Sequence, residues 1–200
     1  MLNVRAYRVT RPRGLSVLLK EQGDPIAKFY LEDAGLYERQ RLCRTYDLLF
    51  EQQWCGFFSL SNHTLKIQAT AQWMSELMRK KKIPREPPGI LLSQLFICES
   101  MRKKGLGAEA LWHAIQYCLK SPAGCRILVV DPLDDELKSF YKKFGLYSAH
   151  GAGKKMYFDL LRYEDTMREV RRLYPTESPA NQLKIFGKME TAEPPQRSLI

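Results

Sequence analysis

A short basic segment with two glycines, Arg102 to Gly107, has the composition of an anion-binding loop. It follows the nearly all-apolar stretch Ile90 to Cys98, which is typical of a buried central strand, and it leads into a helical pattern from Gly105 to Leu119. The first N–H groups of a helix have no intrahelical acceptor and carry a partial positive charge. Because glycine lets an anion approach the backbone closely, the segment predicts a phosphate cradle at the helix start.

Other phosphate-binding motifs fit this segment poorly. The sequence contains no G-x-x-x-x-G-K-S/T, and the dinucleotide pattern G-x-G-x-x-G has Ala110 in place of its last glycine. The motif R-x-x-G-x-G is also short, so a basic turn with a glycine cap explains it equally well. The segment therefore needs a second element before it indicates a function.

A second segment, Asp134 to Gly145, combines a helix start, an aromatic face and a helix stop. Asp134 can cap the free N–H groups of the helix, and Gly145 fits its C-terminal end. The apolar face carries Leu137, Phe140, Tyr141 and Phe144. Tyr141 is either a core aromatic residue or, with a phenol near a reacting group, a proton donor.

The elements around these two segments predict a mixed α/β domain. The expected strands are Val4–Val9, Leu15–Leu19, an antiparallel hairpin of Leu42–Glu51 with Gly56–Leu65, Arg126–Val130 and Lys155–Leu161. The other expected helices are one that Asp24 caps at Pro25, Ala69–Lys82 and Glu164–Tyr174. Residues 1–174 are expected to form the domain, and residues 175–200, rich in Pro, Ser, Thr and Glu, a mobile tail.

Composition excludes several classes of protein. The 200 residues are 44% hydrophobic, which suits one globular domain, and 32 Lys and Arg against 22 Asp and Glu favour a polyanionic ligand. Five cysteines without C-x-x-C spacing and three scattered histidines indicate reduced thiols and no metal site. Without a membrane-spanning run or an evident secretion signal, we expect a cytoplasmic protein with no membrane partner.

Taken together, the two segments resemble the GNAT N-acetyltransferase family. Its members carry R/Q-x-x-G-x-G/A between a strand and a helix, then N-x-x-A-x-x-F/L-Y-x-x-x-G-F on a later helix, and the resemblance covers roughly Arg44 to Leu161. The stretch from Gly56 to Leu60 looks like the family's G-Y-x-x-L strand. The resemblance implies an α/β GNAT fold, with flanking helices and a single mixed, mostly antiparallel sheet splayed at its centre.

The resemblance also implies roles for individual residues. The backbone of Phe96 and Ile97 would pair with the pantetheine arm of acetyl-CoA, and Tyr141 matches the family's general acid. Asp134 stands where the family more often has Asn, which leaves its cofactor contact open. The residues expected to hold the pyrophosphate are Arg102, Lys103, Lys104, Gly105, Leu106, Gly107 and Ala108.

The acceptor is less defined than the cofactor. No general base is assigned, because Glu99, Gln94, His63 and His150 each lack a supporting pattern. An α-amine, with a pKa of about 7.7–8.0, needs less help than a lysine, with a pKa of about 10.4. Four basic runs either border a groove for tRNA phosphates or form solvated faces that attract the cofactor: Arg79–Lys82, Lys142–Lys143, Lys154–Lys155 and Arg171–Arg172.

Three functions remain open at this point. The early helix from Pro25, followed by Arg44 to Tyr46, is similar to the acetyltransferase toxins of toxin–antitoxin pairs, which acetylate the amino acid on charged tRNA. The leading interpretation is therefore acetyl transfer to a primary amine, with charged tRNA as the candidate acceptor and an antitoxin or a second copy in a homodimer as further candidate partners. The alternatives are a protein-lysine or small-amine acetyltransferase and a non-catalytic acyl-CoA-binding module.

Overall fold

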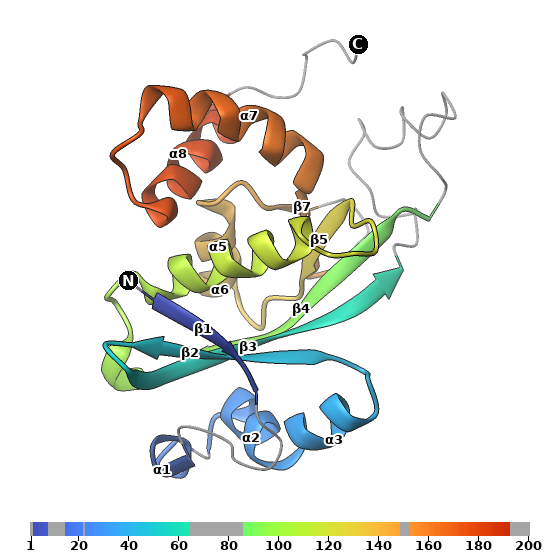
Figure 1. Cartoon of the computed structure of the whole chain (residues 1–200), viewed down its shortest axis with the longest axis vertical. Coiled ribbons are helices and arrows are strands. Elements are labelled where there is room, and N and C mark those ends of the chain that lie inside the picture. The colour runs from blue at the N-terminus through green and yellow to red at the C-terminus, as the bar shows by residue number, and fades with distance from the viewer. Residues whose placement is uncertain (1, 8–14, 22, 65–85, 149–152, 193–200) are drawn as a thin grey trace. The chain divides into compact units, whose positions relative to one another are not determined.

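Seven strands form one sheet in the order β1-β2-β3-β4-β5-β7-β6 (Figure 1). The computed structural model describes residues 2–7, 15–21, 23–64, 86–148 and 153–192. Strands pair antiparallel at β1–β2, β2–β3, β5–β7 and β6–β7. The mixed, mostly antiparallel sheet with flanking helices confirms the predicted fold class.

The elements alternate along the chain much as the sequence predicts. The strands are Leu2–Ala6 (β1), Arg44–Phe50 (β2), Gln53–Thr64 (β3), Pro88–Ile97 (β4), Ile127–Val130 (β5), Tyr147–Ser148 (β6) and Met156–Asp159 (β7). The helices are Leu15–Leu18 (α1), Pro25–Glu32 (α2), Ala34–Arg39 (α3), Leu106–Leu119 (α5), Asp135–Lys142 (α6), Leu160–Leu173 (α7) and Pro179–Ala192 (α8), with a 3-10 turn at Glu99–Met101 (η2).

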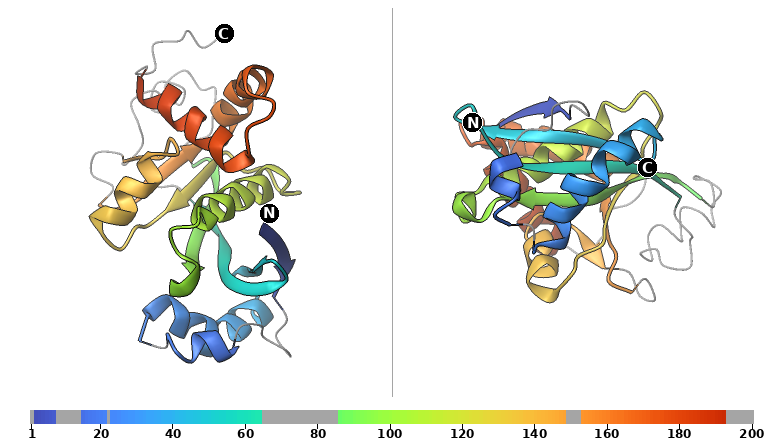
Figure 2. Two further views of the ribbon diagram at one scale, coloured as in Figure 1. Left: turned by 90° about the vertical axis from the view of Figure 1, so that its left-hand side faces the viewer. Right: turned by 90° about the horizontal axis from the view of Figure 1, so that it is seen from below.

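The first of two compact units comprises Met1–Asn62 and Leu91–Tyr117. Within it, α2 and α3 cover one face of β1 to β3, and α5 covers the other (Figure 2). Aromatic rings fill both layers. Tyr30 of α2 packs on Phe57 with ring centroids 4.7 Å apart, and Tyr117 of α5 lies 4.2 Å from Tyr46 on the opposite face.

The β2–β3 hairpin is confirmed, with its turn at Glu51 and Gln52. Both residues have positive φ, 49° and 66°, which matches the backbone that two-residue hairpin turns require. A bulge between Leu48 and Leu49 shifts the register of β2 against β3. The bulge therefore lies beside Gly56, where the adjacent strand β4 approaches closely.

The second compact unit comprises His63–Ile90 and Cys118–Ile200. Every residue of β5 and β7 in its core is buried. Asp159 ends β7 and caps α7, because its carboxylate accepts hydrogen bonds from the N–H groups of Leu161 and Arg162. The same carboxylate pairs with Arg126 at 2.7 Å, so one buried charge joins the residue before β5 to the start of α7.

Three segments differ from the sequence predictions or lie outside the described residues. Leu15–Leu18 is a helical turn rather than a strand, since periodicity cannot separate the two in a run this short. The predicted helix at Ala69–Lys82 lies outside the described residues. Within the predicted mobile tail, residues 179–192 instead form α8, which buries Leu183 and Phe186 at helical spacing.

Among the described residues, no helix is long and apolar enough to cross a membrane.

Candidate active site

The loop between β4 and α5 is shaped by two residues in the left-handed region. The strand ends at Ile97, η2 follows, and Lys103 and Gly105 have φ values of 63° and 81° before α5 begins at Leu106. Glycine adopts such a φ at no steric cost, and a Cβ at Gly105 would meet nothing within 4 Å. The loop is therefore open to solvent at the point where the helix starts.

Five consecutive backbone N–H groups of this loop, from residues 103–107, donate to no acceptor in the part of the chain that the structure describes. The N–H groups on either side are used: that of Arg102 donates to Glu99, and those of Ala108 and Glu109 donate to the carbonyl of Gly105. Unpaired N–H groups at the positive end of a 14-residue helix form an anion cradle. The predicted phosphate site thus has the required donors in its backbone.

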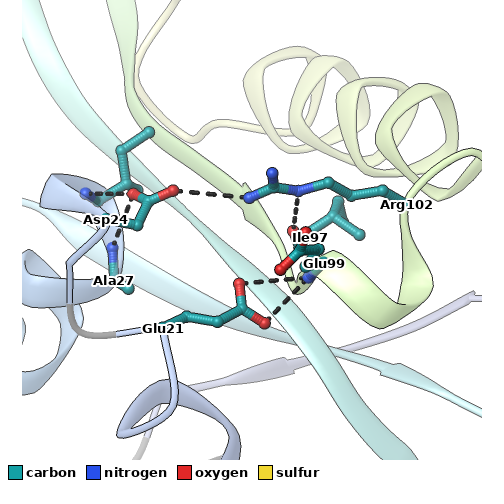
Figure 3. Close-up of polar contacts among 7 residues, drawn as sticks. Glu21, Asp24, Ala27, Ile97, Glu99 and Arg102 are labelled. Atoms are coloured by element: carbon teal, nitrogen blue, oxygen red, sulfur yellow. Dashed lines mark hydrogen bonds and ion pairs between the residues drawn. The ribbon is translucent and has the colours of Figure 1, made fainter.

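The Arg102 side chain is engaged by the protein itself (Figure 3). Its Nε donates to the carbonyl of Ile97 at 3.0 Å, and its Nη2 lies 3.5 Å from Oδ2 of Asp24. Asp24 also caps α2, accepting from the N–H groups of Ile26 and Ala27. The carboxylate of Asp24, at the start of α2, therefore partly neutralises the charge of Arg102. The backbone N–H groups of the loop, rather than the Arg102 side chain, remain available to an anion.

A second carboxylate holds the same loop (Figure 3). Both oxygens of Glu21 accept from the backbone N–H of Glu99, at 3.0 and 3.2 Å. The segment from α1 to α2 is thus fixed to the loop at two points, Glu99 and Arg102. Sequence reasoning identified the Asp24 cap from its local pattern but missed both long-range contacts, for which a single sequence carries no signal.

The end of β4 leads into the loop, and the packing around Phe96 fixes its position. Phe96 is buried and stacks on Phe57 with centroids 5.7 Å apart. A Cβ at Gly56 would lie 3.0 Å from the carbonyl carbon of Phe96 and closer still to its oxygen, so only glycine fits there. On the helix side Leu106 and Ala108 are buried in the core. These buried side chains hold the loop in place. Because the side chains are buried, only the backbone of these residues is available to a ligand.

Helix α6 carries the second predicted motif, in the second unit. Asp134 caps it, accepting from the N–H of Leu137 at 2.8 Å, and Gly145 ends it with φ of 83°. The Asp134 carboxylate is therefore occupied by its own helix. In this unit Tyr141 is 7% exposed, and burial raises the pKa of its phenol above the usual value of 10.0.

The Tyr141 hydroxyl makes no hydrogen bond within the described ranges. Burial keeps the phenol protonated at neutral pH, which a proton donor requires, but it also makes the phenol a weaker acid than an exposed tyrosine. Phe96 to Ala108 belong to the first unit, and Asp134 and Tyr141 belong to the second.

Other candidate groups contribute less. His63 has a pKa lowered by burial and by the charge of Lys155, and among the described residues no cluster of His, Cys, Asp or Glu is suited to a metal. All five cysteines are free. Of the basic runs, Arg79–Lys82 lies outside the described residues; Lys154 donates to the carbonyl of Leu133, and Arg172 pairs with Glu169.

Comparison with known proteins places this geometry in a family. The model of the acetyltransferase (GNAT) family matches residues 24–146, which include both predicted motifs. The chain belongs to the GNAT acetyltransferase family. GNAT enzymes use acetyl-CoA, whose pyrophosphate is a ligand that the unpaired N–H groups of residues 103–107 fit.

Solved structures of GNAT proteins share this fold at low identity. AtaT in complex with acetyl-methionyl-tRNAfMet is 22% identical, with a TM-score of 0.63 over 83% of this chain and 99% of AtaT. A tyrosine-to-phenylalanine mutant of KacT is 18% identical, with a TM-score of 0.62 over 82% of this chain and 98% of KacT. A tyrosine-to-phenylalanine mutant of AtaT, bound to acetyl-CoA and the C-terminus of the antitoxin AtaR, is 18% identical, with a TM-score of 0.59 over 83% of this chain and 97% of AtaT.

Proposed function

We propose that this GNAT protein transfers the acetyl group of acetyl-CoA directly to a primary amine, and that the amine is the α-amine of an aminoacyl-tRNA. The observation that carries the proposal is the run of five unpaired backbone N–H groups in residues 103–107. It supports a bound pyrophosphate because each N–H can donate without displacing an existing hydrogen bond.

In the proposed site, one set of residues binds acetyl-CoA and a different residue, Tyr141, transfers a proton. The loop N–H groups of residues 103–107 bind the pyrophosphate, and the end of β4 at Phe96 and Ile97 aligns the pantetheine arm beside it. Seating of Phe96 against Phe57 keeps that strand end fixed. Fixed alignment of the thioester lowers the entropic part of the barrier to amine attack.

The reaction then requires one proton on the leaving sulfur atom. The neutral amine attacks the thioester carbonyl carbon, a C–N bond forms, and the C–S bond breaks with its electron pair leaving on sulfur. Tyr141 donates its phenolic proton to that thiolate, and the proton released by the acylated nitrogen passes to water. The phenol regains a proton from solvent, so protons and electrons balance over one turnover.

Two observations favour an α-amine on tRNA as the acceptor. Among the residues that the structure describes we assign no side chain as a base, and an α-amine is partly neutral at pH 7 whereas a lysine amine is not. The net charge of +10 suits a polyanionic acceptor. AtaT, which shares the fold, has been solved with acetyl-methionyl-tRNAfMet, and its mutant with the antitoxin AtaR; an antitoxin-like protein is accordingly the second partner that we propose.

The test compares three acceptors in one assay. Free thiol released from acetyl-CoA is measured with total aminoacyl-tRNA, with a lysine peptide and with a polyamine, for the wild type and for Tyr141→Phe. We expect release with aminoacyl-tRNA that is lost in the variant. Release only with the peptide or polyamine would move the acceptor to another class, and acetyl-CoA binding without release to any amine would leave a binding module.

A further inference from the structure

Helix α8 packs against the turn that follows Tyr141. The family match ends at residue 146, so α7 and α8 both lie beyond it. Within the second unit, a Cβ at Gly187 of α8 would lie 2.8 Å from the Cα of Phe144 and closer still to the carbonyl oxygen of Lys143. Backbone meets backbone at this point, and side-chain carbons do not occur at such distances.

The contact is reciprocal. A Cβ at Gly145 would lie 2.6 Å from Cε1 of Phe186 and 3.5 Å from the Cα of Gly187. Gly145 has φ of 83°, so glycine is needed there both for its backbone and for the ring that fills its side-chain space. Two glycines that face each other let α8 approach the end of α6 as closely as two backbones allow.

The turn that α8 contacts is hydrogen-bonded to Tyr141 itself. The N–H groups of Phe144 and Leu146 both donate to the carbonyl of Tyr141, at 3.0 and 3.4 Å. A displacement of residues 143–145 therefore passes directly to the backbone that carries the phenol.

Helix α8 is itself held firmly. Phe186 is 2% exposed, and its ring packs 5.4 Å from that of Phe158 on β7 and 5.2 Å from that of Tyr163 on α7. Arg162 of α7 forms an ion pair with Glu190 of α8. Packed on β7 and α7 in this way, α8 supports the turn at the end of α6.

From this packing we infer that α8 is a positioning element for Tyr141, acting through Gly187 and Phe186. The inference rests on the proposed role of Tyr141 as proton donor. Both residues act at the turn that follows Tyr141: Gly187 sets how closely α8 approaches, and the Phe186 ring fills the space that a side chain at Gly145 would take. Within the segment that the sequence predicts to be a mobile tail, α8 thus supports the turn that follows Tyr141.

The test uses the full-length chain with Gly187→Ala, Phe186→Leu and the control Lys184→Ala. Alanine normally favours a helix over glycine, so a purely local effect of Gly187→Ala would leave activity unchanged or stabilise the protein. We expect kcat to fall roughly tenfold or more, because misplacement of a reacting group by about 1 Å can cost up to about a hundredfold. The KM for acetyl-CoA should stay within about twofold, since the cofactor loop is unchanged.

Two further readouts separate positioning from general damage. Hydrogen exchange should become faster in residues 135–146 of Gly187→Ala and Phe186→Leu, and it should match the wild type in Lys184→Ala, whose side chain is exposed. The alkaline limb of the kcat–pH profile should move to lower pH in both packing variants, because a displaced phenol gains access to water.

The outcomes distinguish this inference from the proposed function. Wild-type kcat and exchange in both packing variants, alongside an inactive Tyr141→Phe, would overturn the inference and leave the proposed function standing. If Tyr141→Phe is fully active, the proton-donor role fails, and the inference fails with it even if exchange in α6 is faster. Should Gly187→Ala not fold, Phe186→Leu decides, since it removes packing without forcing the two backbones apart.

Discussion

The guanidinium of Arg102 lies 3.5 Å from the carboxylate of Asp24, 78 positions earlier in the chain, and donates to the carbonyl of Ile97 at 3.0 Å. One side chain thereby connects the start of α2, the end of β4 and the loop that we propose to bind pyrophosphate. The acidic partner also places a negative charge beside a site intended for an anion. Asp24 should therefore weaken cofactor binding while it orders the loop.

Replacing Asp24 by Asn tests that balance. Asn keeps the helix cap but removes the charge, so the affinity for acetyl-CoA should rise by up to about fivefold, as expected for a partly exposed pair worth about 1 kcal/mol or less. Isothermal titration measures the Kd. The matched control is Glu32→Gln, which removes the same charge from α2 at an exposed pair with Lys28 and should leave the Kd unchanged. An unchanged or weaker affinity in Asp24→Asn would show that the carboxylate does not oppose binding.

The backbone cradle can be blocked sterically. Trp at position 107 would cover the N–H groups of the loop, and acetyl-CoA binding should weaken by roughly a hundredfold or more, because binding there depends on backbone approach. Gly124→Trp is the control, since a Cβ at Gly124 meets nothing within 4 Å. Titration of both folded variants measures the effect. Equal affinities would mean that residues 103–107 do not bind the pyrophosphate.

Loss of the Tyr141 hydroxyl should affect turnover rather than cofactor binding. We expect kcat of Tyr141→Phe to fall by roughly a hundredfold or more, the usual range for a general acid. Burial raises the pKa of Tyr141 above 10.0, and only the protonated phenol can donate. The wild-type rate should therefore hold up to pH 10 and fall only above it, if the protein stays folded. Tyr174→Phe, at an exposed position of the same unit, should retain wild-type kcat at every pH.

Breaking the ion pair of Arg126 with Asp159 should destabilise the second unit. Arg126→Met leaves a buried carboxylate without its partner, which costs about 3 kcal/mol in the free energy of unfolding at pH 7. Chemical denaturation measures this loss. Arg172→Met, which breaks the exposed pair with Glu169, should leave the stability nearly unchanged because solvent screens that pair.

The pH dependence of Arg126→Met provides a second check. Burial already raises the pKa of Asp159, whereas Arg126 opposes that rise, so the variant should have a still higher folded-state pKa. The folded state then binds a proton that the unfolded state lacks, and its stability increases as the pH falls from 7 toward the unfolded pKa of about 3.9. A stability deficit that grows on acidification would contradict this assignment.

Local signals in the sequence were sufficient for the motif elements. Asp24 and Asp134 as helix caps, and Gly145 as a helix end, follow from short-range hydrogen bonding and φ preference, and the structure confirms all three. The loop between β4 and α5 follows from its glycines and its place between an apolar stretch and a helical pattern. These features depend on neighbours a few residues away, which a single sequence specifies.

Long-range contacts were not predictable in the same way. The contact of Glu21 with the N–H of Glu99, and that of Gly187 with Lys143, join segments that no local pattern connects. Helix α8 was hidden by the Pro, Ser, Thr and Glu around it, although Leu183 and Phe186 already had helical spacing. Leu15–Leu18 is too short for periodicity to decide between helix and strand.

The most direct measurement is mass spectrometry of the nucleotides and aminoacyl groups recovered after the purified protein, acetyl-CoA and total charged tRNA are incubated together. The proposed function predicts an acetyl group on the α-nitrogen of the esterified amino acid, formed by the wild type and lost in Tyr141→Phe. Aminoacyl groups that remain unmodified, while the same wild-type protein binds acetyl-CoA and acetylates a lysine peptide or polyamine, would contradict it.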